Sequence, residues 1–302
     1  MAVITTGNHP KALWPGIHAW FGAVYKEHPE EYREVFSIKS SEKNYEEDVL
    51  HSGFGLAPVK PEGMAVQYDS ESQGYTKRYR HVAYALGFIV SHEELQDNLY
   101  EQVSKRRSAK LAFSMRQTRE TVGANVLNRA YNASYTGGDG VELLATTHPS
   151  LNGTWANELT TAADLSEASL EDLLIIISQA TNERGHKIAL RGLKLIVHPN
   201  DMFEACRILK SELRVGTANN DVNAIRNMGL LPEGYVVNHY LTDTDAWFVK
   251  TDAPNGMCWF DREALSFTQD NDYDTMNAKA KSYMRFSTGW SDPRGMYGSP
   301  GA

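Results

Sequence analysis

Two groups of acidic residues have a spacing that suggests a metal site. In the first, Asp270, Asp272 and Asp274 alternate as the first ligands of a calcium-binding helix–loop–helix do. That motif needs a glycine at its sixth position and a glutamate at its twelfth, where this chain has Thr275 and Lys281. The sequence therefore favours an exposed hairpin turn over a calcium loop.

The second group, His239, Asp243 and Asp245, lies between two predicted strands and offers ligands for a divalent cation. A soluble metal-dependent hydrolase is the activity that such a set would serve. A polar turn between two strands explains the same residues, and the sequence favours it. The ten histidines include no H-x-x-x-H pair of metal-binding spacing.

Other signatures of catalysis do not occur in the sequence. Neither G-x-x-x-x-G-K-[ST] nor G-x-G-x-x-G occurs, so no phosphate-binding glycine loop is predicted. The G-x-S-x-G turn of many hydrolases does not occur either. Two cysteines, Cys206 and Cys258, are too few for a disulfide framework or a zinc site. We therefore predict no enzyme activity, no catalytic or metal-binding residue and no cofactor.

The net charge argues against a protein whose main task is to bind nucleic acid. The net charge is −8, whereas proteins that mainly bind nucleic acid carry a basic excess or a basic stripe. The basic residues concentrate in one predicted helix, which also carries Glu101 and Glu120. This cluster fits a solvated helix face or a surface for weak, nonspecific contact with nucleic acid. Its members are Lys105, Arg106, Arg107, Lys110, Arg116 and Arg119.

Hydropathy gives no sign of a membrane protein. No run reaches the roughly 18 apolar residues that a membrane span needs. The first ten residues lack the basic stretch followed by an apolar one that is typical of a secretory signal. Both cysteines are therefore expected to be reduced thiols in a cytosol.

The elements that would position these residues start with an N-terminal segment rich in aromatic residues and prolines. Ile17, Trp20, Phe21 and Val24 have the spacing of one helical face. Because prolines flank this short amphipathic helix, it is more typical of an arm lying on a surface than of a core element.

An overlong strand follows. After a short strand pattern over 64–68 and a polar loop, the residues from Tyr75 to Val90 are rich in β-forming types. Fully extended, this run would measure about 50 Å, several times the length of a usual strand.

The two halves of this strand differ in character. The second half alternates and presents one apolar face that can lie on a core, formed by Val82, Tyr84, Leu86, Phe88 and Val90. The first half, with Arg78 and Arg80, has no such face. We therefore predict a projecting hairpin whose tip, from Tyr68 to Arg80, packs on another molecule. A bent strand within one ordinary sheet is the alternative.

A long helix is predicted next. Ser91 and Glu94 form a capping box at its start, and Val90 with Leu95 forms a hydrophobic staple. Apolar residues recur at helical spacing from there to about Ala130, a length of up to about 60 Å. A glycine-rich loop then ends the helix.

The remaining chain mixes helices and strands, so the predicted fold class is α+β. A second helix begins near Ser166 and stops at Gly185, with Leu170, Leu173, Leu174 and Ile177 as its buried face. A third helix follows 198–200, with Met202, Ala205, Cys206 and Leu209 on one side. Strands are predicted over 193–197, 235–238, 247–250, 259–268 and 278–290.

This order of elements resembles the major capsid proteins of tailed bacteriophages, which have the Hong-Kong-97-type fold. More narrowly, parts of the chain resemble the Mu-like major head subunits. The stretches that carry this resemblance are RYRHVAYALGF (78–88), LKSELRVGTANND (209–221), PEGYVVNHYLTDTDAWF (232–248) and GWSDPRG (289–295). The likeness extends from about Tyr75 to the C-terminus and is weakest over the first seventy residues.

The resemblance implies a division of the chain into regions. It implies an N-terminal arm at 1–45, an extended loop built on a β-hairpin at 46–90, and a peripheral domain with a long spine helix at 91–190. An axial domain at 191–258 and return strands of the peripheral domain at 259–302 complete it. As intersubunit contacts we predict Tyr75, Arg78 and Arg80 in the hairpin and Trp14 and Trp20 in the arm.

The function implied is structural: self-assembly into an icosahedral head shell, made of pentamers and hexamers, that encloses double-stranded DNA with weak nonspecific contact. Because the arm-like segment comes almost at once, the scaffolding protein is expected to be separate, alongside a portal and a head-maturation protease. The shell would be assembled in the host bacterial cytoplasm and end in the virion, with no membrane involved. A cellular nanocompartment shell, similar to the encapsulins, is the alternative of the same fold.

Overall fold

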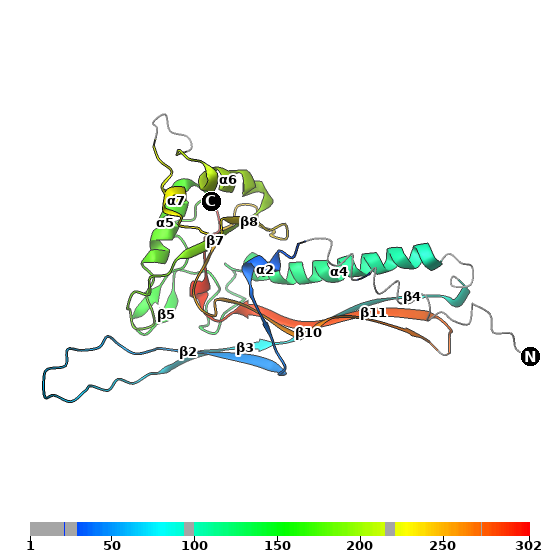
Figure 1. Cartoon of the computed structure of the whole chain (residues 1–302), viewed down its shortest axis with the longest axis horizontal. Helices are drawn as coiled ribbons and strands as arrows, with labels where there is room; N and C mark the ends of the chain where they lie inside the picture. Colours follow the sequence, from blue (N-terminus) through cyan, green and yellow to red (C-terminus); the bar gives the residue numbers. More distant parts are fainter. Residues whose placement is uncertain (1–20, 22–28, 94–99, 215–220, 273) are drawn as a thin grey trace, which may run out of the picture.

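The computed structural model describes residue 21 and residues 29–93, 100–214, 221–272 and 274–302. These residues form an elongated α+β molecule, as predicted, with two four-stranded sheets and two two-stranded ones (Figure 1). Within these ranges no helix is both long and apolar enough to span a lipid bilayer.

The first four-stranded sheet has the order β1-β10-β11-β4 and supports a long helix, α4, along one face (Figure 1). Strands β10 and β11 pair antiparallel along their whole length, from Met257 opposite Trp290 to Asn271 opposite Ala278. The bounds are Ser37–Ser40 for β1, Met257–Asn271 for β10, Ala278–Trp290 for β11, Val82–Val90 for β4 and Tyr100–Asn128 for α4. The 29 described residues of α4 span about 44 Å at 1.5 Å per residue.

The core between α4 and this sheet is largely aromatic. The Trp259 ring stacks on Phe286 with centroids 4.5 Å apart, and Tyr32 lies 4.4 Å from its centroid. Alternate residues of β11, from Ala278 to Phe286, point into this core and are buried. Burial of such large rings provides much of the apolar stabilisation of the region.

The second four-stranded sheet has the order β12-β9-β7-β8 and is accompanied by four helices. Its strands are Met296–Ser299, Trp247–Thr251, Gly192–Val197 and Tyr235–Val237, and its helices are α5 (Glu167–Ser178), η3 (Pro199–Asp201), α6 (Met202–Lys210) and α7 (Ala224–Met228). The predicted start of α5 is confirmed, because Ser166 caps it and shares a reciprocal hydrogen-bonded box with Ser169. Helix α5 packs in this second core, beside Leu195 and Val249.

An antiparallel hairpin of β2 (Tyr45–His51) and β3 (Gln73–Arg80) extends away from both cores, and the loop 52–72 continues it to one end of the molecule (Figure 1). A shorter hairpin pairs β5 (His148–Ser150) with β6 (Gly153–Trp155). The short helices α2 (Tyr32–Val35) and η4 (Pro293–Gly295) complete the described elements.

The predicted continuous strand from Tyr75 to Val90 is wrong in one respect: His81 divides it into β3 and β4. The His81 ring is buried and lies within hydrogen-bond distance of Ser41 Oγ (3.1 Å) and Ser287 Oγ (3.0 Å). On either side of it the strand pairs with different partners, β2 before and β11 after. In β4 the predicted apolar face is confirmed at Tyr84, Phe88 and Val90, which join the core.

Three further predictions need correction. No strand forms over 64–68, because no neighbouring strand lies beside it in the described chain. Helix α5 ends at Ser178, so Gly185 is not its stop. The buried positions of α6 are Ala205 and Ile208, while Met202 stays exposed. The predicted cap at Glu94 and Leu95 lies outside the described residues.

Candidate assembly surfaces

Strand β3 is fixed to its own chain through its odd-numbered residues. The Tyr79 ring is buried, lies 4.9 Å from Phe260, and its hydroxyl is 2.6 Å from Ser291 Oγ. The Tyr75 hydroxyl donates to the Ser291 carbonyl at 3.2 Å. Burial raises the pKa of both phenols, so both stay protonated and able to donate. The prediction that the tip from Tyr68 to Arg80 packs on another molecule is therefore wrong for the rings of Tyr75 and Tyr79, which pack on their own subunit.

The even-numbered residues of β3 face outward. Arg78 pairs with Glu47 Oε1 of β2 at 2.5 Å, and its guanidinium lies 4.5 Å from the centroid of the Tyr45 ring. Arg80 is exposed and makes no ion pair with any described residue. Of the two arginines, Arg80 is therefore the one whose charge is free to meet another molecule.

The loop 52–72 exposes an unusual number of large apolar side chains. The exposed fraction reaches 95% at Tyr68 and 93% at Val59. The full set, called here the loop apolar set, is Phe54, Leu56, Val59, Met64, Val66 and Tyr68. Single exposed apolar residues are ordinary, but six large ones within one loop are typical of a surface that another molecule covers. The tip of the hairpin is therefore this loop, whereas the predicted tip at 68–80 is mostly strand β3.

An ionic contact holds the base of this loop. Asp69 Oδ2 accepts from the Gly55 N–H at 2.7 Å and from Arg184 Nη1 at 2.8 Å. The hydrogen bond from the Gly55 amide lowers the pKa of the Asp69 carboxyl. The Ser70 amide and the charge of Arg184 lower it further. The two limbs of the loop are thus tied together, and to the segment after α5, before they project.

The root of the N-terminal arm docks on α4 through a buried carboxylate. Glu120 accepts from the backbone N–H groups of Glu31 (3.0 Å) and Tyr32 (2.9 Å). Burial raises the pKa of Glu120 to about 7. Phe21 stacks on Phe267 with centroids 4.6 Å apart. The predicted contact residues Trp14 and Trp20 lie outside the described residues.

The basic cluster on α4 is not one solvated face. Arg116 and Arg119 are buried, and Arg119 pairs with Asp261 while its guanidinium lies 5.4 Å from the Trp259 centroid. Arg106 and Lys110 are exposed. The interpretation as a solvated face is therefore wrong for Arg116 and Arg119, which belong to the core.

The two acidic groups form no metal site. His239 Nδ1 lies 2.7 Å from Glu31 Oε1, whereas Asp243 accepts from the backbone N–H of Asp245 within a turn. Over the part of the chain that the structure describes, no three such side chains gather as ligands. The hydrolase alternative thus loses its candidate residues.

The predicted hairpin turn between β10 and β11 is confirmed. Asp270 belongs to β10, and Asp272 in the turn accepts from Lys279 Nζ at 2.5 Å. That pairing and the amide of Asp274 explain the alternating aspartates as turn chemistry, and Lys279 holds the pKa of the Asp272 carboxyl below its usual range.

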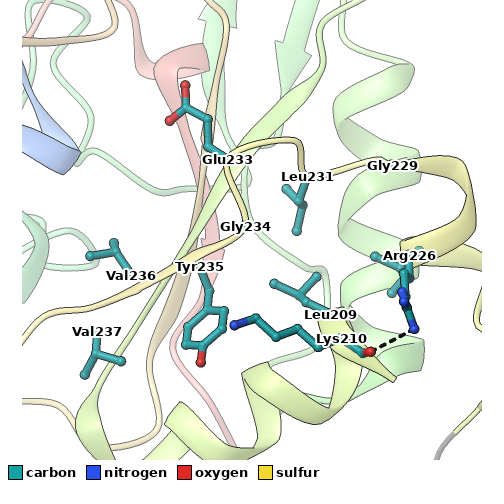
Figure 2. Close-up of a pocket in the computed structure, with 11 residues that line it drawn as sticks. Leu209, Lys210, Arg226, Gly229, Leu231, Glu233, Gly234, Tyr235, Val236 and Val237 are labelled. Carbon is teal, nitrogen blue, oxygen red and sulfur yellow. Dashed lines mark hydrogen bonds between the residues drawn. The ribbon is translucent and has the colours of Figure 1, made fainter. Parts of the chain in front are cut away.

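A groove of about 530 Å³ lies between α6, α7 and β8 (Figure 2). Lys210 Nζ sits 5.5 Å from the Tyr235 ring centroid, and Arg226 Nη1 donates to the Lys210 carbonyl at 2.9 Å. The other lining residues shown are aliphatic, apart from Glu233, which pairs with Lys194 at 2.9 Å. Among the described residues that line this groove, no nucleophile lies beside a general base.

The long helix on a twisted sheet, the second sheet with its own helices and the extended hairpin together define the Hong-Kong-97-type capsid fold. Solved structures with this fold overlap the chain almost completely. The mature capsid of bacteriophage PhiM1 has a TM-score of 0.55 at 11% identity, covering 90% of this chain and 86% of the other. Mycobacterium phage Patience gives 0.54 at 12% identity (98% and 88%). The virus-like particle from Pyrococcus furiosus gives 0.50 at 11% identity (95% and 98%).

At these identities the likeness establishes the fold alone, and the family comes from the sequence. The model of the phage capsid protein family matches residues 74–299, and the chain therefore belongs to that family. No curated protein matches the chain. It is a major capsid protein, a structural subunit that forms the icosahedral head shell and not an enzyme, and its place is the virion capsid.

The sequence alone did not identify two of the features described above, the loop apolar set and the arm-docking carboxylate Glu120. A signal for the first was present: large apolar residues recur between Gly53 and Tyr68 among prolines and glycines that cannot form a core element. For the second, the partners of Glu120 lie 88 and 89 residues away in the chain, and no local pattern shows them.

Proposed function

We propose that neighbouring subunits of the head shell hold together through the extended hairpin and its loop. The observation that carries this proposal is the loop apolar set, whose side chains are 60–95% exposed on their own chain. Burying several such side chains at about 25 cal/mol per Å² gives an apolar driving force for assembly. The shell is built from pentamers and hexamers of this chain and is assembled in the host bacterial cytoplasm.

The intersubunit contacts include Arg80 and Arg78 on the outward face of β3, Tyr75 beside them, and Trp14 and Trp20 of the arm. The exposure of Arg80 and the half-exposed guanidinium of Arg78 support the first two. Tyr75 contributes indirectly, since its bond to Ser291 holds the strand that presents the arginines. For Trp20 the support is its place on the predicted amphipathic face from Ile17 to Val24, and for Trp14 it is its place in the same aromatic-rich segment.

The regional division of the chain is also part of the proposal: an arm at 1–45, an extended loop at 46–90, a peripheral domain at 91–190 and 259–302, and an axial domain at 191–258. The aromatic core under α4 supports the peripheral assignment, and the sheet around β7 and β9 supports the axial one. Helix α5 packs with the second core, so the regions are stretches of chain rather than independently packed units.

The finer relationship is to the Mu-like major head subunits, supported by the four sequence stretches given above. By that resemblance the subunit works with a scaffolding protein, a portal and a head-maturation protease. The shell encloses double-stranded DNA and contacts it weakly. The net charge of −8 and the burial of Arg116 and Arg119 support weak contact, because both reduce the basic surface available to phosphates.

Electron microscopy of the purified, assembled protein tests this function. Closed shells containing DNA support it, and shells that enclose a cargo enzyme and no DNA would instead support the nanocompartment alternative. Free subunits should bind duplex DNA no more tightly than about 10⁻⁵ M at physiological salt, the nonspecific range. Submicromolar affinity at that salt would contradict the weak-contact part of the proposal.

A further inference from the structure

The extended loop contains a segment with the residue pattern of a strand but without a strand partner. Met64, Val66 and Tyr68 alternate with smaller or polar residues, so their side chains would share one face of a strand. All three are more than half exposed. The segment 63–68 carries no charged residue.

The opposite limb of the same loop is unsuited to pair with this segment. It contains Pro58 and Pro61, which lack a backbone N–H, and Gly53, whose φ of +66° turns the chain. The ladder between β2 and β3 therefore ends at His51 and Gln73. Among the described backbone hydrogen bonds, the only one within 56–68 joins the Met64 N–H to the Pro61 carbonyl at 3.3 Å.

Strand β4 has the complementary feature, an unpaired edge. It is the outermost strand of the sheet β1-β10-β11-β4, and the described residues pair with it only on the β11 side. Exposed edge strands are usually protected by charges, prolines, bulges or shortness. Strand β4 has nine residues, none charged and none proline, and it pairs with β11 without a register shift.

Strand β4 also exposes apolar side chains. Val82 and Leu86 are about half exposed although they belong to the face that carries Tyr84 and Phe88 into the core. Ile89, on the opposite face, is 59% exposed. A further strand without charged residues can pair with such an edge, because the pairing then buries no unpaired charge.

The segment and the edge do not meet within one subunit. The loop lies at one end of the long axis of the molecule, while β4 runs toward the other end beneath α4 (Figure 1). Pairing between them therefore requires two copies of the chain. The contact is heterologous, loop to edge, and such a contact closes into a ring when repeated around an axis.

We propose that residues 64–68 of one subunit add as a strand to the free edge of β4 in a neighbouring subunit. This inference rests on the proposed role of the loop as an intersubunit contact and names the site that receives it. Met64, Val66 and Tyr68 lie on the same side of the extended sheet as Val82 and Leu86, so that cross-strand apolar pairs form. Backbone hydrogen bonds supply the affinity, and the apolar pairs set the register.

Cysteine pairs placed on separate subunits test this pairing. In a Cys206→Ser background, one population carries Met64→Cys, Val66→Cys or Tyr68→Cys and the other carries Val82→Cys or Leu86→Cys; the native Cys258 is buried. The two populations are mixed, assembled and mildly oxidised. We expect a covalent dimer in at least one combination, because opposed residues in a strand pair meet the geometry of a disulfide.

The matched control is Gln67→Cys, whose side chain points to the other face of the added strand. It should give little dimer with Leu86→Cys in the same shells. Shells that form normally but give no dimer in any of the six combinations would overturn this inference and leave the proposed function standing. Failure of the unaltered protein to form shells would count against the proposed function instead.

Hydrogen exchange on the unaltered protein gives a second, independent measurement. Backbone amides of 64–68 should exchange at least about tenfold more slowly in shells than in free subunits. The amides of β4 that point away from β11 should slow in the same way. If those amides are already protected in the free subunit, a segment of the same chain covers the edge and the inference is wrong.

Discussion

Tyr79 and Tyr68 lie on the same limb of the extended hairpin and have opposite surroundings. Tyr79 is 2% exposed, packed on Phe260 and bonded to Ser291, whereas Tyr68 is 95% exposed. The base of the hairpin is thus held by its own subunit, and the loop has few contacts of its own. The difference separates the part of the hairpin that is stabilised within one subunit from the part that is available for contacts between subunits.

The same comparison extends to charge. At the base, Arg78 has a partner in Glu47 and Asp69 has one in Arg184, so the polar groups near the hairpin are largely satisfied within the chain. Along the loop the exposed groups are mostly apolar. An exposed apolar surface is a stronger indication of an interface than exposed arginines, because isolated surface charges are ordinary.

The largest effect is expected from removing the apolar character of the loop. A quadruple change of Leu56, Val59, Val66 and Tyr68 to Ser should lower shell yield at least about 100-fold, since each lost burial weakens the contact by more than 1 kcal/mol. The melting temperature of the free subunit should stay the same, because these side chains have few contacts in it. Particle counts by electron microscopy and thermal unfolding measure the two quantities.

The control for this variant is the pair Leu151→Ser and Ile175→Ser, which removes two apolar groups that are more than half exposed elsewhere on the subunit. Shell yield should then be near normal. An equal loss of shells in both variants would contradict the special role of the loop, since the loop would then contribute no more to assembly than other exposed apolar positions.

A smaller effect on assembly is expected from the arginines. Changing Arg78 and Arg80 to Glu together should lower shell yield about tenfold, the loss of one charge-assisted contact of about 1.5 kcal/mol. Circular dichroism of the subunit should be unchanged. Because Arg78 already pairs with Glu47, Arg80→Glu alone should account for most of the loss. Normal yield from the double variant would leave both arginines as charges that protect an edge strand.

The two tyrosines allow the comparison to be measured as stability. Tyr79→Ala should destabilise the subunit by about 3–5 kcal/mol, as expected for a large buried ring, and Tyr68→Ala by less than about 0.5 kcal/mol. Tyr79→Phe keeps the ring and loses only the bond to Ser291, at a cost of about 1 kcal/mol. Urea unfolding of free subunits gives all three values. Similar losses at Tyr68 and Tyr79 would mean that the loop packs on its own subunit.

Much of the fold was predictable because its signals are local. The long helix, the start of α5 at Ser166 and the strand pair β10–β11 follow from periodicity and capping within a few residues. The strands β1, β2 and β12 were missed. Each is short or weakly patterned and exists because a distant strand pairs with it, as β10 does with β1. Strand patterns also do not specify partners, which is why 64–68 has the pattern without the strand.

The buried charges of α4 show a second limit. The sequence predicts for Arg119 a place on a solvated face or on a surface for weak contact with nucleic acid, and it predicts no role for Glu120. Asp261 and the amides of 31 and 32 instead satisfy the two side chains inside the core. These partners are remote in sequence and no spacing rule predicts them. One signal was present: Arg119 lies on the apolar face of the helix, one turn from Met115 and from Val122, where a solvated charge is out of place.

A pH-dependent effect is expected at the arm root, where Glu120 connects the anchored region to the arm. Its folded-state pKa is about 7, above the usual value of about 4.5, because burial disfavours the charged form. The folded subunit therefore binds this proton more tightly than the unfolded chain does. Its stabilising effect is full below about pH 4.5 and is lost as the pH rises through 7.

Urea unfolding of the free subunit between pH 5 and pH 8 measures this contribution as the difference between wild type and Glu120→Gln. The wild type should lose stability relative to the variant as the pH rises, since glutamine has no proton to release. The matched control is Glu47→Gln, which alters a carboxylate on the exposed side of the hairpin, where its partner Arg78 is half exposed. Its curve should run parallel to that of the wild type. Parallel curves for Glu120→Gln as well would mean that the buried carboxylate stays ionised, held by the two amides of the arm root, and that docking of the arm is insensitive to pH in this range.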